Sequence, residues 1–285
     1  MQNINKVFFL AAGLGTRLKP FTDQIAKPAI PFWGLPQILY PYHFTQQLGI
    51  KHWAYNTHHH RQTLQQALAQ FQLTEGQEFF EKDLLDSGGG IFNAKSFLET
   101  EEHFLVINAD SLFIYQNLMQ FEQEILKHIH EDRLATLFTI AKEGAGVTFS
   151  GLHSHNGTLT GAGLHSKNTA MTGACTHYIG IGLFSKKIFS HLTGGPQNII
   201  HDVLVPLASQ ENIHVSILND WDWFELGKTK DFVESFDAVK AHLQSGRYSL
   251  DSFSSFYKTQ KYFNPHWDPE QFISSGIEKE ILGSH

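Results

Sequence analysis

Two glycines and two cationic side chains follow the first apolar run of the sequence, at residues 7–10. Such a run is typical of a buried strand, and the residues directly after it are small and flexible. Gly13 and Gly15 can adopt positive φ angles and carry no Cβ atom, so their backbone amides can converge on an anion such as a phosphate. Arg17 and Lys27 add a forked cation and a point cation, both suited to phosphate oxygens. This stretch therefore predicts a binding site for a polyphosphate.

A carboxylate follows a second apolar run. Residues 104–107 are Phe-Leu-Val-Ile, and Asp110 comes shortly after them. A carboxylate in that position is costly to desolvate, and it usually faces a cation or the open mouth of a site. Mg²⁺ is the natural partner, so we expect Asp110 to bind a metal ion. The alternative is that Asp110 only caps a helix predicted over residues 114–128.

A glycine run forms the third motif. Residues 86–90 read Asp-Ser-Gly-Gly-Gly and precede a helix predicted over residues 91–98. Three glycines let the backbone approach a flat or anionic ligand closely. The same glycines also suit an ordinary flexible turn, and composition alone does not separate these two interpretations.

Two common phosphate motifs do not fit the first loop. The dinucleotide-binding fingerprint needs a third glycine where this chain has Leu18, and the P-loop needs Gly-Lys-Ser/Thr after a four-residue gap. The stretch from Gly13 to Thr22 instead resembles the signature of the sugar-1-phosphate nucleotidyltransferases, G-x-G-x-R-L-x-P-x-T, which is followed by K-P at Lys27. The resemblance continues over residues 31–36, which match the family's P-x-x-G-x-P segment.

The resemblance assigns roles to residues in the first half of the chain. Arg17 and Lys27 would be the catalytic cations that hold the triphosphate and the leaving pyrophosphate. Glu81 lies where the family has an acidic residue before its T-G-G segment, and that segment contacts the nucleobase through its backbone. The expected nucleotide-binding residues are Ala11, Ala12, Gly13, Gly15, Thr16, Glu81, Ser87, Gly88 and Gly89.

The same resemblance implies a metal site and a sugar site. The family's W-x-D segment supplies a second carboxylate to the metal, and the aligned residue here is Glu225, with Asp222 as an alternative. Asp110 and Glu225 would therefore hold Mg²⁺. The E-K-P segment that brings a lysine to the sugar phosphate in many relatives is absent, because Lys167 is the only lysine of residues 149–176. The expected sugar-binding residues are Asn108, Gly151, Tyr178 and Gly180.

Alternating strands and helices must position these residues. The predicted strands lie at 7–10, 52–55 and 78–80, and the predicted helices between them at 36–48 and 62–71. That alternation favours a parallel sheet with helices on both faces, in which ligands bind beyond the carboxyl ends of the strands. The fold class is therefore α/β, a Rossmann-like mixed and mostly parallel sheet. The resemblance implies the glycosyltransferase-A-like nucleotidyltransferase fold.

Composition narrows the classes of function. With 285 residues, 41% of them hydrophobic, the chain can bury a full core. Its net charge of -7 argues against nucleic acid or an anionic membrane as the main partner, and no apolar run approaches the roughly 20 residues of a membrane span. The single cysteine excludes a disulfide framework and a cysteine-based zinc site. We therefore expect a cytoplasmic protein that acts on small ligands.

Three of the 18 histidines are consecutive, at residues 58–60. Consecutive residues point in different directions, whereas a zinc pair on a helix needs a spacing of four. A structural or ligand-adjacent role is therefore expected for residues 55–59, which resemble the Asn-x-His-His strand end of these transferases.

The resemblance spans residues 7–240 and implies the organisation of the chain. We expect a nucleotidyltransferase domain over residues 1–240, with a nucleotide-binding part at residues 1–115 and a sugar-binding part at residues 116–240. Residues 241–285 would form a C-terminal extension packed on the body.

The implied reaction joins an NTP and a sugar 1-phosphate into an NDP-sugar and pyrophosphate, with Mg²⁺ as cofactor. The Ser-Gly-Gly-Gly-Ile form of residues 87–91 is similar to the N-acetylmuramate-1-phosphate uridylyltransferases, so UTP and N-acetylmuramate 1-phosphate are the expected pair. Guanylyl transfer to mannose 1-phosphate and cytidylyl transfer to a phosphorylated alcohol are alternatives. A nucleotide-sugar-binding regulatory module without catalysis is another, because Ala109 and Glu225 depart from the family pattern and the E-K-P lysine is missing.

Overall fold

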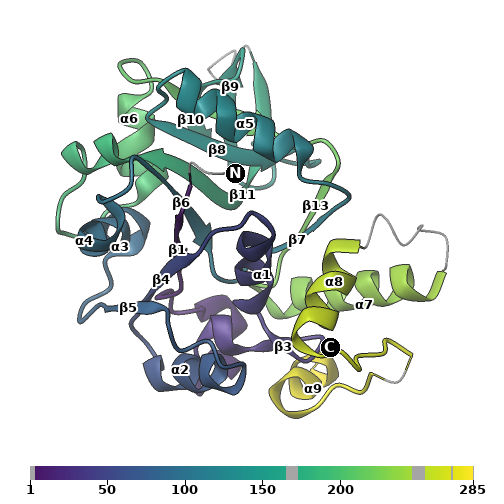
Figure 1. The fold of residues 1–285 in the computed structure, drawn as a ribbon. Helices are drawn as coiled ribbons and strands as arrows, with labels where there is room; N and C mark the ends of the chain where they lie inside the picture. Colours follow the sequence, from purple (N-terminus) through teal and green to yellow (C-terminus); the bar gives the residue numbers. More distant parts are fainter. Residues whose placement is uncertain (1–3, 165–172, 246–253, 271, 285) are drawn as a thin grey trace.

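A mixed β-sheet forms the centre of the computed structural model, which describes residues 4–164, 173–245, 254–270 and 272–284 (Figure 1). Within these ranges the sheet has nine strands, which lie in the order β5 (Gln77–Phe80), β4 (His52–Thr57), β1 (Lys6–Leu10), β6 (His103–Asn108), β11 (Ala174–Ser185), β8 (Ala135–Ile140), β12 (Ile213–Ile217), β10 (Thr158–Gly163) and β9 (Gly151–His155). The pairs from β5 to β6 are parallel, as is the pair β8 and β12, and the others are antiparallel. The expected α/β fold with a mixed sheet is confirmed.

Strand β1 lies in the middle of the parallel part of the sheet. The side chains of Val7, Phe8 and Phe9 are fully buried because the sheet is covered on both faces. A strand buried on both faces reads as a continuous apolar run, which is how this strand could be predicted. Phe9 pairs in register with Tyr55 of β4 and with Ile107 of β6, so the three strands end at the same edge.

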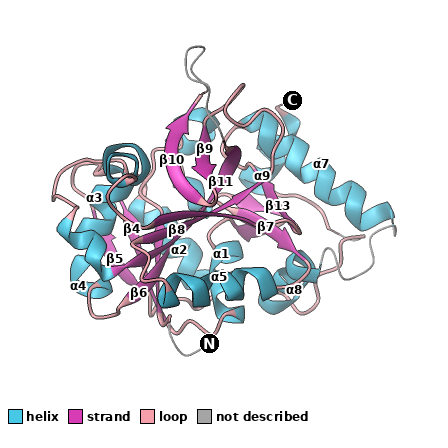
Figure 2. Cartoon of the chain, turned by 90° about the horizontal axis from the view of Figure 1, so that it is seen from above, coloured by secondary structure: helices cyan, strands magenta, loops and turns pink. Residues whose placement is uncertain are grey.

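Helices lie on both sides of the sheet, and an apolar core fills the space on each face (Figure 2). The core against Phe9 joins α1, α2, α5, α7, α8 and α9, and the core against Phe8 joins α3 and α4. No helix in the described ranges is both long enough and apolar enough to cross a membrane. The helices are α1 (Leu39–Gln47), α2 (Arg61–Gln70), α3 (Asp86–Asn93), α4 (Lys95–Leu98), α5 (Met119–His130), α6 (Val205–Leu207), α7 (Thr229–Ser245), α8 (Ser254–Phe263) and α9 (Gly276–Gly283).

The chain after Asp110 differs from the prediction. It forms a further strand, β7 (Leu112–Tyr115), which pairs with β13 (Trp221–Phe224) in a separate two-stranded sheet. The helix expected over residues 114–128 begins only at Met119. Short apolar runs fit a strand or a helix equally well by periodicity, and pairing with β13 decides the outcome here.

The described part of the C-terminal segment packs on the body of the chain, with α9 against α7 and α8 against α1 and β7 (Figure 1). The indole ring of Trp33 stacks on Phe236 of α7, with 4.5 Å between the ring centroids, and meets the edge of Phe256 of α8. Gln260 of α8 donates a hydrogen bond from Nε2 to the carbonyl oxygen of Trp33. These contacts fix the segment that follows Lys27.

Helix α9 places a buried carboxyl group against the same segment. Glu278 is 1% exposed and accepts a hydrogen bond of 3.4 Å from the amide of Gly34. Burial raises the pKa of Glu278 to about 7, and hydrogen bonds from the backbone of Gly34 and Trp33 offset that rise only in part. The carboxyl group therefore stays protonated in the folded protein at pH values where it is ionised in the unfolded chain.

We predict that Glu278→Gln removes one component of the pH dependence of stability. As the pH rises from about 4.5 to about 7, unfolding releases the Glu278 proton, so the wild type loses stability relative to the variant over that window. Thermal unfolding at several pH values measures the difference. The matched control is Glu280→Gln, at an exposed position of the same helix. Parallel pH profiles for wild type and Glu278→Gln would contradict the role given to burial.

Candidate active site

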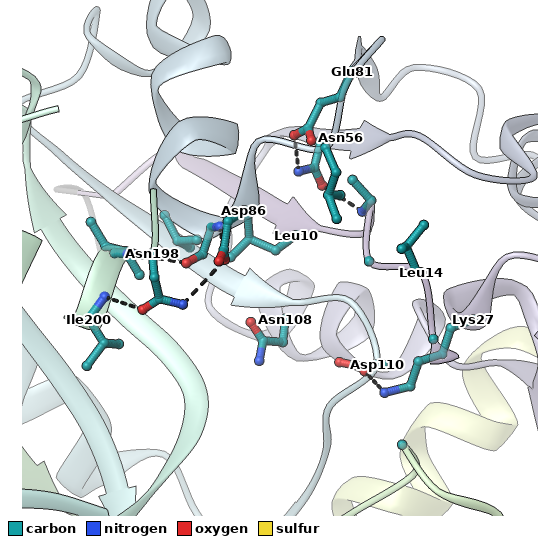
Figure 3. Close-up of a pocket in the computed structure, with 18 of the residues that line it drawn as sticks. Leu10, Leu14, Lys27, Asn56, Glu81, Asp86, Asn108, Asp110, Asn198 and Ile200 are labelled. Atoms are coloured by element: carbon teal, nitrogen blue, oxygen red, sulfur yellow. Dashed lines mark hydrogen bonds and ion pairs between the residues drawn. The ribbon is translucent and has the colours of Figure 1, made fainter. Parts of the chain in front are cut away.

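A cavity of about 980 Å³ lies beyond the carboxyl ends of β1, β4 and β6 (Figure 3). This is the edge of an open α/β sheet at which ligands bind, and the volume suits a ligand of nucleotide size. Most of the residues predicted from the sequence line it, namely Ala12, Gly13, Gly15, Thr16, Arg17, Lys27, Glu81, Ser87, Asn108, Asp110 and Tyr178.

The side chain of Asn56, near the carboxyl end of β4, fixes the loop that follows β1 (Figure 3). Its Oδ1 atom accepts hydrogen bonds from the amides of Ala11 (2.5 Å) and Ala12 (3.1 Å), and its Nδ2 atom donates to Glu81 Oε1 (2.7 Å). Asn56 is 3% exposed, so water cannot reach it to replace a lost hydrogen-bond partner, and loss of a partner would destabilise the fold. These hydrogen bonds engage the amides of Ala11 and Ala12 in shaping the loop, and Ala12 lines the cavity whereas Ala11 does not.

Glu81 is a wall residue with both carboxylate oxygens in use. Besides the bond from Asn56, its Oε2 atom accepts a hydrogen bond of 3.0 Å from the amide of Leu85. Burial raises the pKa of Glu81, and the bonds from Leu85 and Asn56 oppose that rise. Glu81 thus joins the loop after β5 to the loop after β1, and its oxygens are not free for a nucleobase in this arrangement.

Of the two glycines in the first loop, only Gly15 uses a left-handed conformation, with φ of 62°. A Cβ atom there would lie 2.8 Å from Thr22 Cγ2 and 3.1 Å from Lys27 Cβ, so the close packing also requires glycine. Thr22 donates a hydrogen bond to the carbonyl of Gly15. Gly13 has open space around its Cα atom, which leaves its backbone free to contact a ligand.

Two cations and two carboxylates meet where the loop faces Gly227. Lys27 forms an ion pair with Asp110, and Arg17 lies 3.9 Å from Glu225, whose Oε1 also accepts the amide of Gly227 at 2.9 Å. A Cβ atom on Gly227 would overlap that oxygen and lie 2.8 Å from Lys27 Nζ. The four charges therefore share one small region. Asp110 and Glu225 are each about one quarter exposed, so both can be reached by a ligand.

The structure separates the alternatives for the carboxylates. Asp110 lies in the turn between β6 and β7, so it does not cap a helix. Asp222, in strand β13, is exposed and lines neither this cavity nor the second one described below. Glu225 is the carboxylate of that segment that lies beside Arg17.

Residues 196 and 198–201 form a part of the cavity wall that the sequence did not predict. Asn198 donates from Nδ2 to Asp86 Oδ1 (3.3 Å), and its Oδ1 atom accepts from the amides of Ile200 and His201 (Figure 3). It thereby caps a short π-helix, Ile199–Leu204. An asparagine directly before an apolar run is a helix N-cap signal that could have revealed this element.

The glycine run makes packing contacts that the sequence did not predict. It lies inside helix α3, and the amides of Gly88 and Gly89 both donate to the carbonyl of Gln197. Cβ atoms at these two positions would collide with residues 195–199. Neither glycine lines the cavity, and the contacts that both make in this structure are packing contacts. Ser87 lines the cavity, and its Oγ atom accepts the amide of Ile199.

The four predicted sugar-binding residues divide into two groups. Asn108 and Tyr178 line the cavity. Gly180 does not line the cavity. Its φ is 83°, and a Cβ atom there would lie 2.7 Å from Asn108 Nδ2. Gly151 packs against Cys175 in the pairing of β9 with β11 and lines neither cavity.

A second cavity of about 520 Å³ adjoins the first, and Arg17 lines both of them. Its wall includes Glu225 and two groups that the sequence analysis did not select, Lys142 and His177. Neither stands in a recognisable motif, because the antiparallel half of the sheet brings them together only in the folded chain.

A sequence profile of the family described as nucleotidyl transferase matches residues 6–242. The chain belongs to the nucleotidyl transferase family. Among its relatives, mannose-1-phosphate guanyltransferase beta-A of Xenopus laevis is 21% identical over 235 residues, which are 80% of this chain and 62% of the relative. The catalytic subunit beta of mannose-1-phosphate guanylyltransferase from Drosophila melanogaster is 22% identical over 237 residues, again 62% of its length. The chain thus spans less than two thirds of these relatives.

Solved structures show the same fold as this nucleotidyl transferase. HddC from Yersinia pseudotuberculosis in complex with GMP-PN superposes with a TM-score of 0.67 at 18% identity, covering 82% of this chain and 99% of that one. An apo UDP-glucose pyrophosphorylase superposes with a TM-score of 0.68 at 19% identity, covering 84% and 99%.

We predict that Gly227→Ala lowers the activity of this nucleotidyl transferase without unfolding it. The added methyl group displaces only the ends of Glu225, Lys27 and Arg17, which are flexible. Displacement of charged groups at a reaction centre by about 1 Å costs about 10- to 100-fold in rate. Pyrophosphate release and thermal unfolding measure the two effects.

Gly283→Ala is the matched control, because Gly283 is exposed on α9 and a methyl group there meets nothing within 4 Å. Full activity in Gly227→Ala would show that the four charges do not act together.

Proposed function

We propose that the chain transfers a nucleotidyl group from an NTP to a sugar 1-phosphate, which yields an NDP-sugar and pyrophosphate. The observation that carries this proposal is the meeting of Lys27, Asp110, Arg17 and Glu225 around Gly227, at the junction of two cavities. A reaction between two phosphorylated substrates needs cations for the phosphates, carboxylates for a metal ion and room for both substrates. The cluster and its two cavities offer all three.

The reaction needs no covalent intermediate on the protein. An oxygen of the acceptor phosphate attacks the α-phosphorus, a new P–O bond forms, and the bond from the α-phosphorus to the bridging oxygen breaks. Pyrophosphate leaves with that electron pair, and no proton has to be removed because the nucleophile is already anionic. The side chains therefore act by positioning the substrates and neutralising charge.

In this proposal the backbone from Gly13 to Thr16 holds the triphosphate. Lys27 and Arg17 neutralise it, and both already lie in the wall of the first cavity. Lys27 is the less exposed of the two, at 11% against 58% for Arg17. Burial strengthens the interaction of Lys27 with phosphate, because the local dielectric is lower there. Arg17 lines both cavities and can contact the phosphates of both substrates.

Asp110 and Glu225 would hold Mg²⁺. In the described part of the chain, no group of three or more histidine, cysteine or acidic side chains forms a ready-made metal site. Mg²⁺ does not need one, since it is commonly bound by one or two carboxylates together with substrate phosphates and water. The pair therefore fits this ion. Bound Mg²⁺ would supply positive charge to the reacting phosphate oxygens.

Two pairs of substrates are each supported by one observation. The named relatives are mannose-1-phosphate guanylyltransferases, which supports GTP with mannose 1-phosphate. The Ser-Gly-Gly-Gly-Ile sequence of residues 87–91 supports UTP with N-acetylmuramate 1-phosphate. The fold is shared with enzymes named for several bases, so it does not choose between the pairs.

We predict that the protein releases pyrophosphate with Mg²⁺ and one NTP and sugar 1-phosphate pair. The assay crosses GTP, UTP, CTP, ATP and dTTP with the 1-phosphates of mannose, glucose, N-acetylglucosamine and N-acetylmuramate. One strongly preferred pair supports the proposal and identifies both substrates. Nucleotide binding without any pyrophosphate release would instead support a nucleotide-sugar-binding module without catalysis.

We predict that Asp110→Asn lowers turnover about 10²- to 10³-fold at saturating Mg²⁺, because it removes one charged contact from the reaction centre. The variant keeps the shape of the side chain, and thermal unfolding checks that the fold is retained. Near-full turnover in Asp110→Asn would contradict the assignment of Asp110 to the metal.

A further inference from the structure

The second cavity has an aromatic wall. His177 of β11 lies between two rings, with its centroid 5.1 Å from that of Phe149 and 4.5 Å from that of Trp223. Tyr178, the next residue of β11, lines the first cavity, so this strand separates the two. Aromatic faces suit the C–H faces of a sugar ring, because both surfaces are apolar while the edges of the sugar are polar.

The same wall carries polar atoms without partners. Among the described residues, neither ring nitrogen of His177 nor the indole nitrogen of Trp223 has a hydrogen-bond partner, although all three are buried. Burial and the nearby Lys142 lower the pKa of His177 to about 4, so its ring is neutral at physiological pH, with one donor and one acceptor nitrogen. Because these three nitrogens have no exposed surface, the wall meets the cavity with the carbon atoms of its rings rather than with these polar atoms.

Lys142, which follows strand β8, is the cation of this wall. Its Nζ atom lies 4.6 Å from the ring centroid of Trp223 and 5.7 Å from that of Phe149. No carboxylate of the described chain forms an ion pair with it, whereas Lys228 of the same cavity is paired with Asp231 at 3.1 Å. Glu225 and Asp231 attract Lys142 from beyond ion-pair distance, so an incoming anion can become its direct partner.

Lys142 lines the same cavity as two charged residues of the proposed reaction centre. Arg17 and Glu225, two of the four charges around Gly227, also line this cavity. A phosphate bound between Lys142 and Arg17 would lie at the junction of the cavities, beside a triphosphate held in the first. The ring attached to that phosphate would extend along the aromatic wall.

We infer that the second cavity is the acceptor site and that Lys142 binds the phosphate of the sugar 1-phosphate. The inference rests on the proposed function and adds the residue that recognises the acceptor. Phe149, His177 and Trp223 then hold the sugar ring. They replace the expected sugar-binding residues Asn108 and Tyr178, which line the first cavity.

The test is Lys142→Met, which removes the charge but keeps a flexible side chain that can still pack on the rings. Loss of one charge-assisted contact raises the KM for the sugar 1-phosphate about 10- to 100-fold, while the KM for the NTP stays within about twofold. Lys142→Arg keeps the charge and the stacking on aromatic rings, so it restores most of the acceptor affinity. Lys187→Met is the control, because Lys187 is a surface lysine paired with Asp132.

Two kinetic results would overturn the inference. The first is an unchanged acceptor KM in Lys142→Met, and the second is a rise confined to the KM for the NTP, which would place the nucleotide in the second cavity.

If no substrate pair turns over, the proposed function is contradicted, but the acceptor site can still be tested by binding. Calorimetric titration with each sugar 1-phosphate then tests the acceptor site by itself. Weaker binding to Lys142→Met than to the wild type supports the site. Equal binding, or no binding to the wild type, refutes it.

Discussion

The hydrogen bonds of Asn56 are the interaction on which the rest of the site depends. One side-chain amide joins the loop after β1 to Glu81, and Glu81 in turn holds the amide of Leu85 at the start of α3. The third glycine of α3 fits the same arrangement, since a Cβ atom on Gly90 would lie 2.7 Å from Asn56 Nδ2. Asn56, Glu81, Ala11 and Ala12 are all buried, so this part of the network resists rearrangement. The loop whose amides we propose to bind phosphate is therefore shaped before any ligand arrives.

The charges at the reaction centre are arranged differently, because they can exchange partners. Without substrate, Lys27 is neutralised by Asp110, and Arg17 lies near Glu225. A polyphosphate and a divalent cation offer each group a new partner of opposite sign, so substrates can replace the existing contacts without leaving a buried charge unpaired. The hydrogen bonds of Asn56 hold the backbone of the site in place, whereas the paired charged side chains can exchange their partners.

The sequence predicted the features that depend on local chemistry. Strand β1, the left-handed glycine at Gly15 and the cations of the first loop follow from residue types and spacing, and the family follows from their order. The start of the helix expected after Asp110 was wrong, because residues 112–115 pair with a distant strand, β13, and this pairing overrides the local pattern. Lys142 was missed for the same physical reason, because its role comes from contacts between segments far apart in the chain, which leave no local signature. Asn198 has a local signal as a helix N-cap, but its contact with Asp86 of α3 is again one between distant segments.

A crystal structure with the NDP-sugar product and Mn²⁺ tests the central claim most directly, since Mn²⁺ can replace Mg²⁺ and its anomalous scattering locates it. We expect the metal peak within coordination distance of both Asp110 and Glu225, the α-phosphate at the junction of the cavities and the sugar against Phe149 and Trp223. A metal bound by neither carboxylate, with the phosphates away from Lys27, would contradict the account.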